Sequence, residues 1–163
     1  TAPARRSCRC SRRHVAADYS GKRGAPALWV VVDKFSGAPK RRKAWVMNAG
    51  PDCDLKGLRA KAQSDAHSVT LSVPADDGPP KTLHLSFAGV REPKPEFMML
   101  GRNGLYRCST PAAAADGGDG FFAVITVQRG APPPITVEAT GLEAKVRVGK
   151  RTLRFDGEKI LME

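Results

Sequence analysis

The residues of this chain that could act on or bind another molecule are concentrated near its N-terminus. His14 could remove a proton, Tyr19 could donate one, and basic residues surround both. β-Elimination on a uronic-acid polymer needs such a base, such a donor and positive charge beside the carboxylate. The candidate substrate-binding residues are Arg12, Arg13, His14, Tyr19, Lys22, Arg23, Arg41, Arg42 and Lys43. Because residue types alone do not show that side chains converge, no catalytic residue is assigned.

Other catalytic chemistry finds less support. The sequence has no Gly-x-Ser-x-Gly elbow for a serine nucleophile. His67 precedes a predicted strand in a polar stretch, so we expect it to lie in a loop. His84 falls on the polar face of another predicted strand, so we expect it to be exposed. The aspartates mostly lie in turn-like contexts, which favours a structural role over paired carboxylates for glycoside hydrolysis.

The cysteines do not predict a metal site. The sequence contains Cys8, Cys10, Cys53 and Cys108. Four cysteines allow three full pairings, and the sequence does not choose among them. Cys8 and Cys10 with His14 give three tightly spaced ligands, whereas a structural zinc site usually has four with wider gaps. We therefore expect no metal and no cofactor.

The charge balance indicates a polyanionic partner. The chain carries 27 Lys and Arg against 16 Asp and Glu, a net charge of +11. Modules that bind single-stranded nucleic acid combine such charge with exposed aromatic rings, but Trp29 and Phe121 lie inside apolar runs and Phe87 on a predicted inward face. Nucleic acid is therefore a less favoured partner. No stretch approaches the ~20 apolar residues of a membrane helix, so no membrane association is predicted.

Alternation and turn residues define the elements that must position these side chains. The continuously apolar Ala27–Val32 predicts a central strand covered on both faces, and Phe121–Val127 predicts a second. Strict alternation over Ser68–Val73 and Thr82–Phe87 predicts half-buried strands, each with one polar face. Residues 54–66 predict at most a short helical turn, because Gly57 and the polar remainder weaken the pattern.

Several turn signals separate the predicted strands. Asp77–Pro80 predicts a turn, and Asn103-Gly104, Gly149-Lys150 and Asp156-Gly157 each predict a tight hairpin. The chain is therefore expected to be all-β, an antiparallel β-sandwich of about ten strands with little or no helix. We expect residues 1–12 to form a basic, mobile N-terminal segment and residues 13–163 a single β-sandwich domain.

Two regions of the sequence resemble the late β region of heparinase II/III-like polysaccharide lyases. The first comprises Arg12–Val15, Gly24–Lys34 and Lys43–Asn48, in which a basic strand leads to an apolar strand ending in Val-Val-Asp, followed by a Trp strand. The second comprises Phe121–Val127, Val146–Gly149 and Phe155–Gly157, similar to the closing strands of the same sandwich. Lys34 stands where the family has Arg.

The resemblance implies a C-terminal β-sandwich domain of a secreted or periplasmic lyase that acts on an acidic polysaccharide. Such a domain would support and line the substrate cleft. The family's helical toroid and its His-x-His motif have no counterpart in this sequence, so most catalytic residues would lie outside the chain. The implied partners are the acidic polysaccharide and a separate N-terminal chain or domain of the parent protein.

Three other functions remain open. The chain could be a stand-alone carbohydrate-binding or adhesion module, a basic nucleic-acid-binding β domain or, least favoured, a complete enzyme. The sequence leaves the sugar, its linkage, the disulfide pairing and the oligomeric state undetermined.

Overall fold

The computed structural model describes residues 10–22, 24–36, 44–48, 61–64, 68–88, 94–100, 103–109, 120–139 and 141–163. These residues form strands and connections, with no helix among them, and all the strand pairs are antiparallel. The strands are β1 (Cys10–Asp18), β2 (Ala27–Ser36), β3 (Ala44–Asn48), β4 (Lys61–Ser64), β5 (Ser68–Val73), β6 (Lys81–Phe87), β7 (Lys94–Leu100), β8 (Asn103–Ser109), β9 (Gly120–Arg129), β10 (Ile135–Val137), β11 (Val146–Val148), β12 (Arg151–Phe155) and β13 (Ile160–Met162). The predicted antiparallel all-β class is confirmed.

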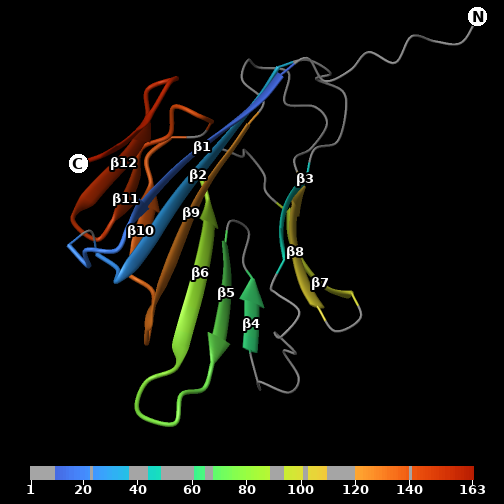
Figure 1. The fold of residues 1–163 in the computed structure, drawn as a ribbon, viewed down its shortest axis with the longest axis vertical. Coiled ribbons are helices and arrows are strands. Elements are labelled where there is room, and N and C mark those ends of the chain that lie inside the picture. The colour runs from blue at the N-terminus through green and yellow to red at the C-terminus, as the bar shows by residue number, and fades with distance from the viewer. Residues whose placement is uncertain are drawn as a thin grey trace, which may run out of the picture.

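The strands are distributed over three sheets (Figure 1). A central six-stranded sheet has the order β1-β2-β9-β6-β5-β4. The C-terminal sheet contains β10-β11-β12-β13, and a small sheet contains β3-β8-β7. The two lie on opposite sides of the central sheet in Figure 1, which gives a layered, sandwich-like architecture. The predicted count of about ten strands is not confirmed. β1 also begins at Cys10, within the segment 1–12 that was expected to precede the domain.

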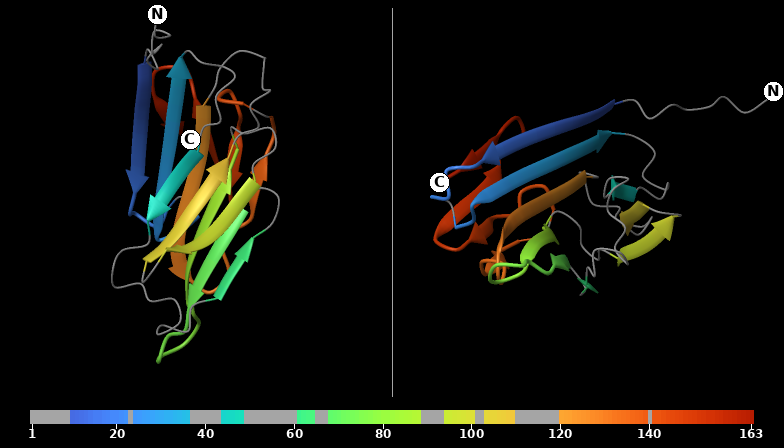
Figure 2. Two further views of the ribbon diagram at one scale, coloured as in Figure 1. Left: turned by 90° about the vertical axis from the view of Figure 1, so that its right-hand side faces the viewer. Right: turned by 60° about the horizontal axis from the view of Figure 1, so that its bottom comes forward.

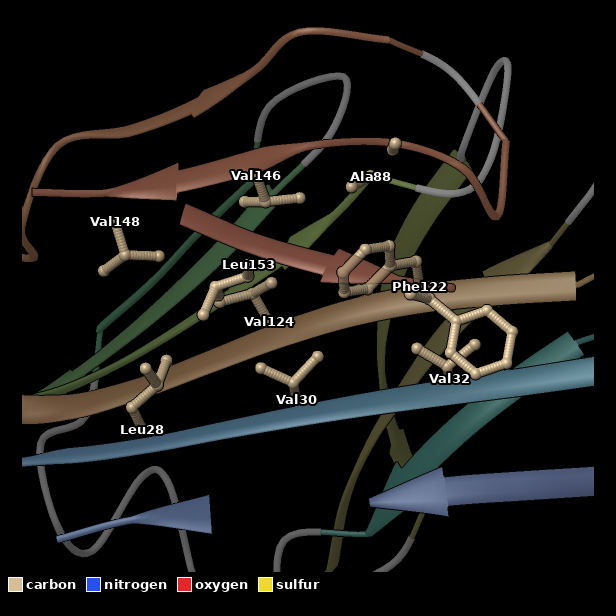
Figure 3. Packing of buried hydrophobic residues seen from close by; sticks show 11 residues of the cluster. Leu28, Val30, Val32, Ala88, Phe122, Val124, Val146, Val148 and Leu153 are labelled. Atoms are coloured by element: carbon tan, nitrogen blue, oxygen red, sulfur yellow. The ribbon is translucent and has the colours of Figure 1, made fainter. Parts of the chain in front are cut away.

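The apolar runs at β2 and β9 form the middle of the molecule, as predicted. Val30 and Val32 of β2 pack with Phe122 and Val124 of β9 and with the C-terminal sheet (Figure 3). The alternate residues of the same strands, such as Val31, belong to a second buried cluster on the opposite face. Burial on both faces explains why neither strand alternates between apolar and polar residues.

The prediction of one solvated face for β5 and β6 is wrong. Thr82 and Ser86 of β6 are buried, at 3% and 6% exposure. His84, expected to be exposed, is half-buried, and its Nδ1 lies 2.7 Å from the hydroxyl oxygen of Thr70 on β5. Short hydroxylated side chains can be buried when they form hydrogen bonds. The alternation of apolar and polar residues therefore predicted which side chains share a face of β5 and β6, but not how exposed each face is.

One of the three predicted two-residue hairpin turns is confirmed, and a second is found as a longer turn. Val148 pairs with Arg151, which leaves Gly149-Lys150 as a two-residue turn, and Gly149 has a φ of 58°. Asp156 and Gly157 also lie in a turn, although it runs from Asp156 to Lys159. Type I′ turns favour glycine because they need positive φ.

The third hairpin and the predicted helical turn require correction. Asn103 and Gly104 lie within β8, where Asn103 pairs with Leu100, so the connection precedes the Asn-Gly dipeptide. Lys61–Ser64, part of the segment predicted as a helical turn, forms strand β4 and pairs with β5. Tertiary pairing overrides the weak local preference there. The rest of that segment, residues 54–60 and 65–66, lies outside the described residues.

The turn after β12 predicts an acid-dependent loss of stability. The Oδ1 atom of Asp156 accepts hydrogen bonds from the backbone N–H groups of Lys159 (2.8 Å) and Glu158 (2.9 Å). These bonds, chiefly that from Lys159, lower the pKa of Asp156 from its usual 3.8. A lowered folded pKa stabilises the fold above the unfolded value, and this stabilisation is lost as pH falls through the folded pKa.

Replacing Asp156 with alanine is therefore expected to lower the free energy of unfolding at neutral pH. The difference from the wild type should shrink below pH 3.8. Urea denaturation at neutral and acidic pH measures both values. Asp156→Asn keeps an oxygen acceptor and should lose less. An equal deficit for Asp156→Ala at both pH values would show that the carboxylate bonds do not hold this turn.

Candidate functional site

The register of β1 divides the predicted substrate-binding cluster between the two faces of the central sheet. His14 pairs with Val32, whose side chain belongs to the cluster under the C-terminal sheet. Arg13 pairs with Asp33, so it lies on the opposite face. Because successive side chains of a strand alternate, Arg12 shares the face of His14, and Tyr19, directly after β1, does not. The structure does not bring His14 and Tyr19 together.

Arg13 is engaged by a buried acid. Its Nε and Nη2 atoms donate to the two carboxylate oxygens of Asp33, at 2.6 and 2.8 Å. The Asp33 side chain is only 7% exposed, whereas that of Arg13 is 60% exposed. The hydrogen bonds to Asp33 raise the pKa of Arg13 further above its already high usual value. Arg13 therefore compensates a buried charge, which reduces its capacity to neutralise a ligand.

The described histidines occupy structural positions. The ring of His14 is half-buried, and its centroid lies 4.9 Å from that of Phe155 in the C-terminal sheet. The His84 ring is hydrogen-bonded to the Thr70 hydroxyl group on the neighbouring strand of the central sheet. In the described part of the chain, no base, proton donor and cation converge. No group of three potential metal ligands occurs there either.

Tyr19 and Trp29 form an aromatic pair at the connected ends of β1 and β2. The ring centroids are 5.4 Å apart and the planes meet at 86°. The Trp29 indole N–H donates to the Tyr19 hydroxyl oxygen at 2.9 Å, which fixes the edge-to-face arrangement. Tyr19 is 67% exposed, and Trp29 is half-buried rather than buried as its apolar surroundings predicted. The pair thus offers an aromatic surface to solvent.

The connection between β1 and β2 lies against the β11–β12 turn (blue and red in Figure 1). Gly24 permits this approach, because a Cβ there would lie only 3.2 Å from the Val148 carbonyl oxygen. Gly149 lies next to Gly24 and is favoured by its φ of 58°, since a Cβ there would make an ordinary contact at 3.7 Å from the Gly24 Cα. Arg151 adds a contact, since its Nε donates to the Lys22 carbonyl oxygen at 3.5 Å. Residues more than a hundred positions apart in the sequence therefore meet at one end of the domain.

This contact gathers cations without acidic partners. Lys22, Lys150 and Arg151 are exposed, and none forms an ion pair with another described residue. The nearest acid along the β1–β2 connection is Asp18, whose Oδ1 accepts from the Ser20 backbone N–H at 2.8 Å. We call the set Tyr19, Lys22, Trp29, Lys150 and Arg151 the hairpin-end site.

Three arginines elsewhere on the described surface form ion pairs within the domain. Arg129 pairs with Asp77, Arg147 with Glu138 and Arg154 with Glu163. Lys34, Lys81, Lys145 and Lys159 are also exposed without an ion pair to a described residue, so the hairpin-end site is distinguished by the contact that places Arg151 beside Lys22 and not by unpaired charge alone. Exposed cations at the same end of the β1–β2 hairpin as an aromatic pair suit an anionic ligand that also has apolar ring faces.

Sequence reasoning found part of this site. It selected Tyr19 and Lys22, but not Lys150 or Arg151, because no local pattern places the β11–β12 turn beside the β1–β2 connection. The signal that could have indicated the contact was Gly24, since a glycine allows backbone segments to approach closely.

The remaining predicted residues are not tested. Arg23, Arg41, Arg42, Lys43 and His67 lie outside the described residues. So do Cys8 and Cys53, while only the backbone is described at Cys10 and Cys108. The disulfide pairing therefore stays open.

Among the residues that the structure describes, no helix has the length and apolarity to cross a bilayer. Comparisons with protein-family models, curated proteins and solved structures found no match to this chain.

Proposed function

We propose that this chain is a β-sandwich domain that binds an acidic, uronic-acid-containing polysaccharide through the hairpin-end site. The observation that carries the proposal is the contact of the β1–β2 connection, which holds Lys22, with the β11–β12 turn, which holds Lys150 and Arg151, at the end of the hairpin where Tyr19 and Trp29 pair. The three cations have no acidic partner among the described residues. Pyranose rings present apolar C–H faces that pack on aromatic rings. Their carboxylates are bound by Arg and Lys through charge-assisted hydrogen bonds.

The resemblance to heparinase II/III-like lyases gives this binding a biological setting. In that setting the domain belongs to a secreted or periplasmic lyase and lines one side of the substrate cleft. β-Elimination would be carried out mostly by residues of an N-terminal chain or domain. The positions of His14 and His84 support a non-catalytic role, because both rings have structural partners.

A stand-alone carbohydrate-binding module is the second candidate. It is favoured by the fact that the hairpin-end site is built entirely from this domain's own strands and turns. The two proposals differ in one measurable property. A cleft-lining domain should gain affinity when its N-terminal partner is supplied, whereas a stand-alone module should bind equally well without it.

Nucleic acid binding is less favoured by the same geometry. Sequence-tolerant binding of single strands uses successive aromatic platforms, each of which stacks one base. The hairpin-end site offers one edge-to-face pair, in which the Trp29 indole N–H is already bonded to Tyr19.

Removing the three cations tests the site. The variant Lys22→Ala/Lys150→Ala/Arg151→Ala should bind heparin or alginate about ten- to a hundredfold more weakly than the wild type, if each exposed charge contributes about 0.5–1 kcal/mol. Its affinity should also depend less on salt, because fewer counterions are released on binding. Isothermal titration across a salt series measures both quantities.

A matched control uses cations at the opposite ends of the same elements. Lys34 lies near the far end of β2, Lys145 precedes β11, and Lys159 lies in the β12–β13 turn. All three are exposed, so the triple alanine variant at these positions removes the same charge. An equal loss of affinity in both variants would show that the net charge alone, and not the hairpin-end site, accounts for the binding. Stronger binding to single-stranded DNA than to the polysaccharides at raised salt would contradict the proposal.

A further inference from the structure

β1 has an unpaired outer edge in the described structure. It is the terminal strand of the central sheet and pairs only with β2, and it lies at the margin of the sheet in Figure 2 (left view). Such an edge presents unpaired N–H and C=O groups that can accept another strand. Val15, near the middle of β1, is 60% exposed. It is one of three exposed large hydrophobic residues among the described residues, with Tyr19 and Val137.

We propose that two copies of this chain pair antiparallel through β1, joining their central sheets into one. In a regular antiparallel pair, residues that point their backbone groups across the new edge must face each other. On one strand these residues are all odd-numbered or all even-numbered. The numbers of two residues that face each other therefore add up to an even number. Two copies of β1 can thus pair only in registers in which one residue, the centre, faces the same residue of the second copy, and the two-fold axis passes between these two residues.

The side chains of β1 select one of these registers. A register centred on Arg13 would place two arginines opposite each other, which is destabilising. A register centred on Val15 places Val15 opposite Val15 of the second copy and Arg12 opposite Asp18, twice. Arg13 then faces the small Ala17 and keeps its pairing with Asp33.

Neighbouring registers lack this complementarity. Centring on His14 places two histidines together and leaves Arg12 opposite Ala16. Centring on Ala16 shortens the paired segment and leaves Arg12 beyond the end of the partner's β1, which stops at Asp18. The Val15-centred register is thus the one that combines an apolar centre with opposite charges at both ends.

The net charge opposes this association. Each chain carries +11, so long-range repulsion disfavours a dimer at low ionic strength. Screening by salt weakens that repulsion more than it weakens backbone hydrogen bonds and the valine contact. The dimer should therefore tighten as salt is added, the reverse of the salt dependence expected for polysaccharide binding.

Analytical ultracentrifugation of the full chain, over a range of protein and salt concentrations, tests the proposal. We expect a monomer–dimer equilibrium that Val15→Lys weakens about tenfold or more, because two lysines then face each other. Arg12→Glu should also weaken it, since Glu would face Asp18. Val137→Lys is the matched control, because it places the same charge at an exposed valine of β10. It should leave the equilibrium unchanged.

Hydrogen exchange gives a second readout that does not depend on a variant folding normally. In the wild type, alternate β1 amides, those facing away from β2, should become protected as protein concentration rises. A monomer at all concentrations and salts would overturn the proposal. So would a dimer that Val15→Lys and Val137→Lys weaken equally, or whose formation leaves β1 amide exchange unchanged. Protection of β1 only by an added foreign peptide would assign the edge to a different partner.

Discussion

Replacing Phe122 with alanine is expected to lower the free energy of unfolding by about 3–5 kcal/mol. The Phe122 side chain on β9 is fully buried and belongs to the cluster that contains Val32 of β2 and Val146 and Leu153 of the C-terminal sheet, so it helps to fill the space between the two sheets (Figure 3). The truncation removes a large apolar surface and leaves a cavity that strands fixed on both sides by hydrogen bonds cannot easily close. Urea denaturation monitored by tryptophan fluorescence measures the loss.

The exposed Val137 provides the control for this experiment. Its side chain in β10 is 41% exposed, so Val137→Ala should change stability by about 0.5 kcal/mol or less. A cost below about 1 kcal/mol for Phe122→Ala would mean that the two sheets do not pack in solution as the structure shows.

Replacing Arg13 with alanine is expected to cost about 1–3 kcal/mol. The variant leaves the Asp33 carboxylate buried without its bidentate partner. Because the Arg13 side chain is 60% exposed, water can reach part of the vacated site, which keeps the cost below that of a fully buried pair. The same denaturation measurement applies.

Two further variants serve as controls for Arg13→Ala. Arg154→Ala removes the Arg154–Glu163 pair, whose side chains are 44% and 58% exposed, and should cost about 1 kcal/mol or less. Asp33→Asn, added to Arg13→Ala, removes the uncompensated charge and should recover part of the loss. If Arg13→Ala proves no more costly than Arg154→Ala, Asp33 is better solvated than the structure indicates.

The elements that sequence predicted best are those with purely local signals. The unbroken apolar runs of β2 and β9 identified the central strands, and Gly149-Lys150 identified a hairpin, because burial and positive φ each leave a direct trace in the sequence. The separation of β3, β7 and β8 into a sheet of their own and the burial of the polar face of β5 and β6 left no such trace. Thr82 and Ser86 are polar yet buried, and only the tertiary packing determines this.

The candidate site was predicted in part for the same reason. Tyr19 and Lys22 were selected as residues of suitable type near a turn. The neutralisation of Arg13 by Asp33 follows from the β1–β2 register, which sequence did not give. The contribution of Lys150 and Arg151 follows from the packing of two distant turns. Residue type thus predicted an anion-binding surface, whereas strand register and turn packing determine which side chains lie together.

The most direct test of the proposed function is a map of the residues that respond to an acidic oligosaccharide. Proton–nitrogen correlation spectra would be recorded while an alginate oligosaccharide is added to the full chain, with a neutral oligosaccharide of equal length as the control. The account predicts shifts of the Trp29 indole N–H and of the backbone amides of Tyr19, Lys22, Lys150 and Arg151, which saturate together. Shifts confined to other parts of the domain, or equal shifts with the neutral sugar, would contradict it.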